Sequence, residues 1–171
     1  DEGNSNYPSL NDPKVNDLYR LVRASGQNDE LRLLARNPGD VALWLTDRHG
    51  RVLGRAARRG EEWLFQTPDA APGADGAIAE DAVWHERFRV DFFETVIPAQ
   101  VSADGSFVWA LSNRGRDKLA LVKLDLGNGG EQVVHADARV DVSQVVFSRR
   151  TREPLALALD PDVQEWRFLD P

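Results

Sequence analysis

The feature that most constrains the fold of this chain is an internal repeat. Residues 18–26 (LYRLVRASG) match residues 121–129 (LVKLDLGNG) at an offset of 103 positions. An apolar run that ends in a hydroxyl residue and a polar turn also occurs around Thr46, Ser102 and Ser148, and the first and last of these lie 102 positions apart. Two matches at nearly one offset indicate a double step, with about 51 residues in each structural unit.

The units are predicted to consist of β-strands. Residues 15–22 could also place their apolar side chains on one face of a helix, but the matching run 118–126 contains β-branched Val122 and ends in the hairpin signal Gly-Asn-Gly-Gly. Gly50 and Gly105 supply the positive φ that tight hairpins need. Strands are therefore predicted near residues 17–23, 31–36, 41–46, 51–57, 61–67, 87–92, 97–101, 106–112, 118–125, 131–135, 142–148, 154–159 and 164–169.

Four antiparallel strands in about 51 residues are typical of a β-propeller blade. We expect an all-β fold, a partial β-propeller of about three four-stranded antiparallel blades, rather than a β-sandwich, which is the main competing all-β fold. An extended arm is expected at residues 1–13 and the partial propeller at 14–171. Its blade pieces are expected at about 14–36, 41–92, 97–135 and 142–171, with a surface loop near 68–82.

Composition excludes several classes of function. The chain has no Cys, so it has no disulfide, thiol nucleophile or thiolate metal site. With 28 acidic against 21 basic residues its net charge is −7, which argues against nucleic acid as a partner. No apolar run is long enough to span a membrane. Because the chain also contains no Met, we expect it to be a piece of a longer protein.

No catalytic or metal-binding constellation is evident in the sequence. Gly-x-Ser-x-Gly, the nucleophile motif of α/β-hydrolases, is absent, and His49, His85 and His135 are not spaced as zinc ligands are. The segments 47–50 and 103–105 are expected to be hairpin turns and not calcium loops. The arginines between 48 and 59 are expected on a solvated strand face. We therefore predict no catalytic, cofactor-binding or metal-binding residue and no cofactor.

Five tryptophans raise the question of an aromatic binding platform. Trp44, Trp109 and Trp166 fall within predicted strands, where large rings usually fill the space between packed sheets. We therefore expect these three to belong to the core between blades.

Residues 111–126 (LSNRGRDKLALVKLDL), preceded by Ser-Ala-Asp-Gly at 102–105, form the most distinctive stretch. Together with residues 11–20 and 166–171, they resemble the N-terminal β-propeller of the prolyl oligopeptidase family of serine peptidases, in particular bacterial dipeptidyl-peptidase and acylaminoacyl-peptidase relatives. The resemblance implies a cap that restricts access to a C-terminal α/β-hydrolase domain, which carries the catalytic residues and is absent from this chain.

Because the resemblance covers only the cap, it implies no catalytic residue in this chain. Glu61 and Glu62 form an acidic pair like the one that holds a substrate amino terminus in some relatives, but they stand at a predicted strand start without helical context, so we assign them no role. The loop from Asn113 to Asp117 could bind substrate or a neighbouring domain. The simpler expectation is a well-hydrogen-bonded loop in which Asp117 pairs with Arg114 or Arg116.

The leading hypothesis is a non-catalytic, substrate-gating portion of a bacterial serine peptidase, inactive alone. Its partners would be the hydrolase domain of the parent protein and, indirectly, a peptide substrate. The alternatives are a stand-alone propeller-like scaffold of the periplasm and an unrelated β-sandwich. The sequence leaves periplasm and cytoplasm both open. Because an incomplete propeller leaves apolar faces uncovered, we also expect self-association of the isolated chain, with a homodimer as the first expectation.

Overall fold

The computed structural model of this chain describes residues 17–22, 30–91, 93–160 and 163–169. These residues form thirteen β-strands in four antiparallel sheets. The strands are β1 (Leu18–Val22), β2 (Glu30–Ala35), β3 (Val41–Thr46), β4 (Val52–Arg59), β5 (Glu62–Pro68), β6 (Trp84–Val90), β7 (Val96–Val101), β8 (Phe107–Ser112), β9 (Ala120–Asp125), β10 (Glu131–His135), β11 (Val142–Phe147), β12 (Pro154–Leu159) and β13 (Glu165–Phe168).

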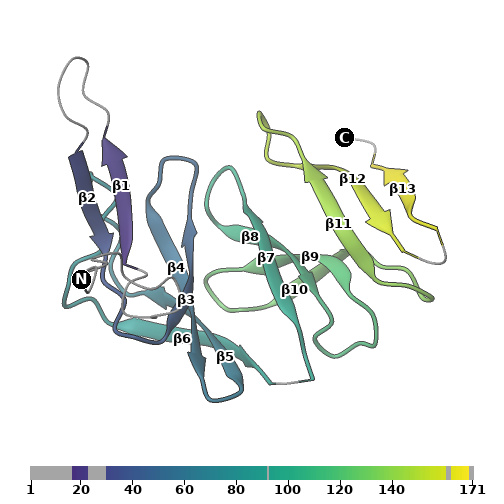
Figure 1. Cartoon of the computed structure of the whole chain (residues 1–171), viewed down its shortest axis with the longest axis horizontal. Coiled ribbons are helices and arrows are strands. Elements are labelled where there is room, and N and C mark those ends of the chain that lie inside the picture. The colour runs from purple at the N-terminus through teal and green to yellow at the C-terminus, as the bar shows by residue number, and fades with distance from the viewer. Residues whose placement is uncertain (1–16, 23–29, 92, 161–162, 170–171) are drawn as a thin grey trace, which may run out of the picture.

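Each sheet is an up-and-down meander in which every strand pairs with its neighbour in sequence. The orders are β1-β2, β3-β4-β5-β6, β7-β8-β9-β10 and β11-β12-β13. Figure 1 shows the sheets following one another in chain order, from β1 and β2 at the left to β13 at the right. All thirteen predicted strands are confirmed, although β6 begins at Trp84, three residues before the predicted start. Among the described residues, no helix has the length and apolarity that a membrane crossing requires.

Three apolar layers separate the four sheets. The first holds Leu34 and Ala35 of β2 against Val52 of β4, with Trp44 and Trp84 packed beside them. A bulge in the β1–β2 pairing leaves Leu34 without a partner in register and lets it turn toward this layer together with Ala35. The arm predicted at residues 1–13 lies outside the described residues.

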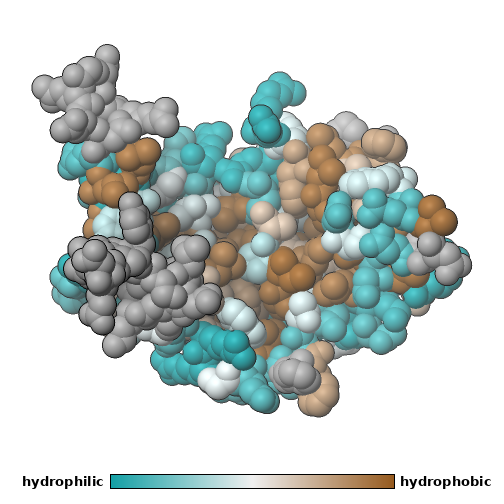
Figure 2. Space-filling model, viewed as in Figure 1, coloured by the Kyte–Doolittle hydropathy of each residue, from teal (hydrophilic) through white to brown (hydrophobic). Residues whose placement is uncertain are grey.

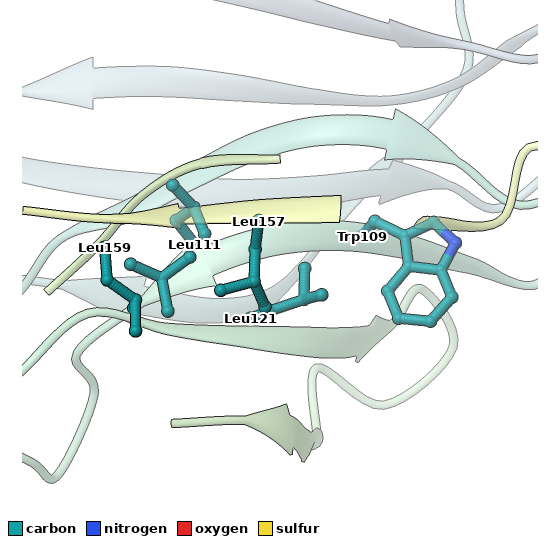
Figure 3. Packing of buried hydrophobic residues seen from close by; sticks show 6 residues of the cluster. Trp109, Leu111, Leu121, Leu157 and Leu159 are labelled. Carbon is teal, nitrogen blue, oxygen red and sulfur yellow. The ribbon is translucent and has the colours of Figure 1, made fainter. Parts of the chain in front are cut away.

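The second and third layers lie on the two faces of the β7–β10 sheet. On one face, Val101 and Val108 pack with Leu45 of β3. On the other face, a larger cluster joins β8 and β9 to β11 and β12 (Figure 3), and it is made of Trp109, Leu111, Leu121, Val142, Leu157 and Leu159. Residues alternate between the faces along each strand, so one sheet supplies two layers.

The segment between β5 and β6, predicted to be a surface loop, fastens the first two sheets to each other. The amide of Ile78 donates to the carbonyl of Leu34 (2.9 Å), and the amide of Val52 donates to the carbonyl of Gly76 (3.2 Å). Gly76 has a φ of 88°. A side chain there would lie 3.0 Å from the carbonyl of Gly50, so the close approach requires glycine.

Candidate functional site: the junction of the four-stranded sheets

A cluster of charged residues, partly buried, surrounds the loop from Asn113 to Asp117. Glu131, at the start of β10, has a side chain only 7% exposed. Its carboxylate accepts hydrogen bonds from the hydroxyl of Ser112 (2.7 Å), from Arg114 (3.3 Å) and from Arg116 (3.2 Å). Ser112 is completely buried. Such a buried carboxylate holds its neighbours firmly, because losing it would leave two cations and a hydroxyl without their acceptor.

This cluster also reaches the preceding sheet. The guanidinium of Arg114 lies 4.4 Å from the centre of the Phe88 ring on β6, a distance suited to cation–π attraction. The same guanidinium donates to the carbonyl of Gly129 (3.1 Å). Gly129 has a φ of 72° and sits so close to β6 that an added Cβ would lie 2.6 Å from the carbonyl oxygen of Arg87. The loop, through Arg114, and the β9–β10 turn, through Gly129, therefore both contact β6 of the preceding sheet.

The prediction that Asp117 pairs with Arg114 or Arg116 is wrong. Asp117 is 88% exposed and pairs with Lys118 (3.3 Å), while both arginines pair with Glu131. Glu131 is 15 residues beyond Arg116 in the sequence, so no local pattern indicates the contact. The expectation of a well-hydrogen-bonded loop is confirmed. The amide of Thr95 donates to the Asn113 side chain (2.6 Å), and the amide of Arg116 donates to the Asn113 carbonyl (2.9 Å).

An apolar cleft of about 410 Å³ opens between the two sheets, beside β7. Its lining includes the apolar residues Leu43, Trp63, Phe65, Val96 and Ile97 together with the carboxylate of Glu94. The volume falls in the range of small-ligand sites. The Glu94 carboxylate accepts from the amide of Gly115 (3.0 Å), so it is tied to the loop described above.

A second cleft, of about 480 Å³, lies between the same sheets and is lined by more polar residues. Its charged groups are already engaged locally. Arg87 donates to the hydroxyl of Thr67 (2.7 Å), Asp69 accepts from the amide of Val83 (3.2 Å), and Asp125 accepts from the amide of Gly127 (2.8 Å). Neither cleft brings a nucleophile and a base together among the described residues that line it.

The three histidines lie in three different places. His49 occupies the β3–β4 turn, where it accepts from Arg48 (2.9 Å), His85 lies on β6 and His135 ends β10. Within the described ranges, no group of three His, Asp or Glu side chains is arranged to hold a metal ion.

The turns at Asp47 and Asp104 are hairpin turns, as predicted. The Asp47 carboxylate accepts from the amides of His49 and Arg51 and from the Arg51 side chain (2.6 Å). Burial opposes ionisation of Asp47, but these bonds outweigh it and lower its pKa. Asp104 has its pKa lowered to about 2, chiefly by the hydroxyl of Ser102, which donates to it at 2.6 Å. Both carboxylates serve to close their own turns.

Trp44 and Trp109 lie between sheets as predicted, but the prediction for Trp166 is wrong. Trp44 packs against Trp84 with ring centres 5.9 Å apart, and Trp109 is buried in the third layer. Trp166 is 43% exposed, because it points from the outer face of the last sheet. The expectation that a solvated face carries the arginines also fails at Arg55, which packs 4.2 Å over Trp84 and has its pKa lowered by burial.

Glu61 and Glu62 form no site with each other in the structure. Glu62 begins β5 and pairs with Arg89 (3.0 Å), and Glu61 occupies the exposed β4–β5 turn. The ion pair is a contact between neighbouring strands, consistent with a structural role.

Comparison with known proteins shows that most of the chain is similar to part of a peptidase. The chain is 29% identical over 168 aligned residues to dipeptidyl aminopeptidase BIII of Pseudoxanthomonas mexicana, and the match covers 94% of this chain. The chain spans only 22% of that relative's length. No protein-family model matches the chain, and no solved structure matches it significantly. The chain is thus distantly related to a part of one dipeptidyl aminopeptidase.

Proposed function

We propose that this chain is part of the β-propeller of a serine peptidase of the prolyl oligopeptidase family. The whole protein would release dipeptides from the amino terminus of peptides, and this chain would take part only together with a separate catalytic domain. The observation that carries the proposal is the match to a dipeptidyl aminopeptidase, which runs through nearly the whole chain but takes up less than a quarter of the relative. A chain of this length therefore corresponds to part of one domain of such an enzyme and not to the whole enzyme.

The fold supports the propeller portion in particular. Four up-and-down antiparallel sheets packed face to face in chain order are how propeller blades are arranged. In such an architecture β3, β7 and β11, each at one edge of its sheet, would line the inner side of the ring. In this proposal, the propeller limits the size of the peptides that can reach the active site. The catalytic nucleophile lies in the hydrolase domain.

The test is expression of the whole reading frame that encodes this chain. We expect it to encode Gly-x-Ser-x-Gly in an α/β-hydrolase domain, and the purified whole protein to release p-nitroaniline from dipeptidyl-p-nitroanilides. Replacement of the motif serine by alanine should abolish this release. The 171-residue chain alone should release none. A reading frame without the motif would favour a scaffold protein, and hydrolysis by the chain alone that a serine-directed inhibitor blocks would contradict the proposal.

A further inference from the structure

The edge strands β3 and β7 form the two sides of a groove. Each stands at one edge of its four-stranded sheet, so within the described residues it pairs on one side only. The groove consists of the apolar cleft of about 410 Å³ described above and a smaller hollow of about 190 Å³, and the two share Leu43 and Pro98 in their lining. Both sheets are packed between other sheets of the chain, so the groove lies at an internal junction of the stack.

The cleft offers apolar side chains that solvent still reaches. Ile97 on β7 is 48% exposed and Leu43 on β3 is 38% exposed, and they line the cleft together with Trp63 and Phe65. Figure 2 shows apolar surface in the middle of the view, between the positions of β3 and β7 in Figure 1. A ligand that covers these side chains gains free energy, because it removes apolar surface from water. This part of the groove therefore suits an apolar side chain.

The smaller hollow has polar backbone in its walls. Residues 43–46 of β3 and 98–101 of β7 line it without interruption. Successive side chains of a strand point to opposite faces, so four residues in a row line one hollow only where the backbone itself is part of the wall. An edge strand exposes N–H and C=O groups that an extended peptide can pair with, whereas a fatty acid cannot. The wall therefore favours a peptide as the occupant.

Of the described residues that line the smaller hollow, Arg152 alone is charged. It belongs to the β11–β12 turn, yet the side-chain oxygen of Gln100 on β7 accepts hydrogen bonds from its Nε and from one Nη. These bonds use one edge of the planar guanidinium. The second edge, formed by the two Nη groups, has no partner among the described residues.

The backbone of Arg152 also indicates that its side chain has a role. Its φ is 63°, a conformation that glycine would adopt without strain, and a strained residue beside a groove points to function. Arg51, Arg114 and Arg116 each pair with an acidic side chain, whereas no described acid pairs with Arg152. A guanidinium edge matches a carboxylate, which it binds through two parallel hydrogen bonds.

We propose that this groove binds the carboxy-terminal segment of an apolar peptide. The terminal carboxylate pairs with the open edge of Arg152, and an apolar side chain enters the cleft beside Ile97. The peptide backbone lies along β3, since Pro98 leaves β7 one donor short. The six residues of β7 span about 17 Å, which an extended peptide of about five residues matches. The proposal rests on the groove alone and does not depend on the peptidase relation.

Tryptophan fluorescence of the purified chain tests the proposal, because Trp44 and Trp63 line the groove. The probe is a peptide of about five alternating leucine and alanine residues, with an acetylated amino terminus and a free carboxylate. Acetylation blocks the amino terminus, so the measurement reports binding and not aminopeptidase activity. We expect saturable binding with a Kd below about 1 mM, and the carboxyl amide of the peptide should bind at least about tenfold more weakly. Ile97→Thr should weaken binding of the free acid several-fold, because it removes apolar contact.

The variant Arg152→Gly separates recognition from folding. Glycine accepts the φ of this turn, so the thermal midpoint should stay level or rise. The variant should nevertheless lose at least about tenfold in affinity for the free acid and should bind acid and amide alike. Arg150→Gln is the matched control and should bind as the wild type does, because it removes the same charge from an exposed side chain of the same turn that does not line the groove.

Three results would overturn the proposal. The first is the absence of binding to the wild type up to about 1 mM peptide, or equal affinity for the acid and the amide. The second is an Arg152→Gly variant that binds like the wild type and unfolds at a lower temperature, which would show that Arg152 only fastens its turn to β7. The third is octanoate bound as tightly as the peptide, which would show a site for any apolar carboxylate instead of a peptide.

Discussion

Alanine substitutions at two glycines with the same left-handed backbone conformation test how tightly the two four-stranded sheets pack. Gly129 and Gly115 have φ values of 72° and 65°, so alanine at either position costs about 1–2 kcal/mol for the left-handed backbone. A Cβ at Gly115 would meet no atom within 4 Å. One at Gly129 would lie 2.6 Å from the Arg87 carbonyl oxygen and 2.9 Å from a ring carbon of Phe88. Forcing that overlap costs about 1–3 kcal/mol more.

We therefore expect Gly129→Ala to lower the free energy of unfolding by about 2–5 kcal/mol and Gly115→Ala by about 1–2 kcal/mol. Urea unfolding followed by tryptophan fluorescence measures both. At about 2–4 °C per kcal/mol, thermal unfolding should separate the two variants by several degrees. If the losses agree within about 0.5 kcal/mol, the β9–β10 turn does not press against β6 and the packing described above is refuted.

Three further predictions concern the layers and the turns. Leu157→Ala should cost about 2–5 kcal/mol because it opens a cavity between sheets, whereas Leu155→Ala, 44% exposed on the same strand, should cost far less; equal shifts in the urea midpoint would contradict this. Ser102→Ala should raise the pKa of Asp104 from about 2 in a carboxyl-carbon NMR titration. The lowered pKa of Asp104 stabilises the fold at a pH above the ordinary pKa of 3.8, and this stabilisation is lost as the pH falls toward 2. The variant should therefore be less stable than the wild type at neutral pH, and the difference should shrink in acid. A pKa of Asp104 that stays near 2 in the variant would count against the Ser102 hydrogen bond. Glu131→Ala should cost about 3 kcal/mol, and a neutral result would show that the buried carboxylate does not hold its loop.

The strands were predictable because their signals are local. Runs of apolar and β-branched residues predict the strands, and turn signals such as His49-Gly50 and Asp104-Gly105 predict the β3–β4 and β7–β8 hairpins within about ten residues. The early start of β6 was not predictable, because Trp84, His85 and Glu86 have no clear alternation and are strand only through pairing with β5. Tertiary pairing decides such cases over propensity.

The charged junction was only half predictable. The sequence indicates a polar, hydrogen-bonded loop at Asn113, but it does not show that Glu131 is the acceptor, because β9 separates the two in the chain. Both belong to one sheet, in which Ser112 pairs with Ala120 at the start of β9 and Glu131 pairs with Leu124 near its end. Long side chains, and not neighbouring backbone positions, therefore make the contact. Contacts of this kind depend on register and cannot be read from spacing.

The repeat governs backbone geometry even where the residue type opposes it. At the offset of 102, Gly50 of the β3–β4 turn corresponds to Arg152 of the β11–β12 turn. Gly50 has a φ of 72°, and Arg152 adopts a φ of 63°, the one non-glycine residue of the described chain with positive φ. Each of the two closes its turn with a backbone hydrogen bond: the amide of Arg152 donates to the carbonyl of Ser148, four residues back (2.8 Å), and the amide of Gly50 donates to that of Asp47, three residues back (3.0 Å). An arginine accepts this strained conformation only because the paired strands on both sides fix it. The positive φ at Arg152 therefore comes from the strands that flank the turn and not from a glycine in its own sequence.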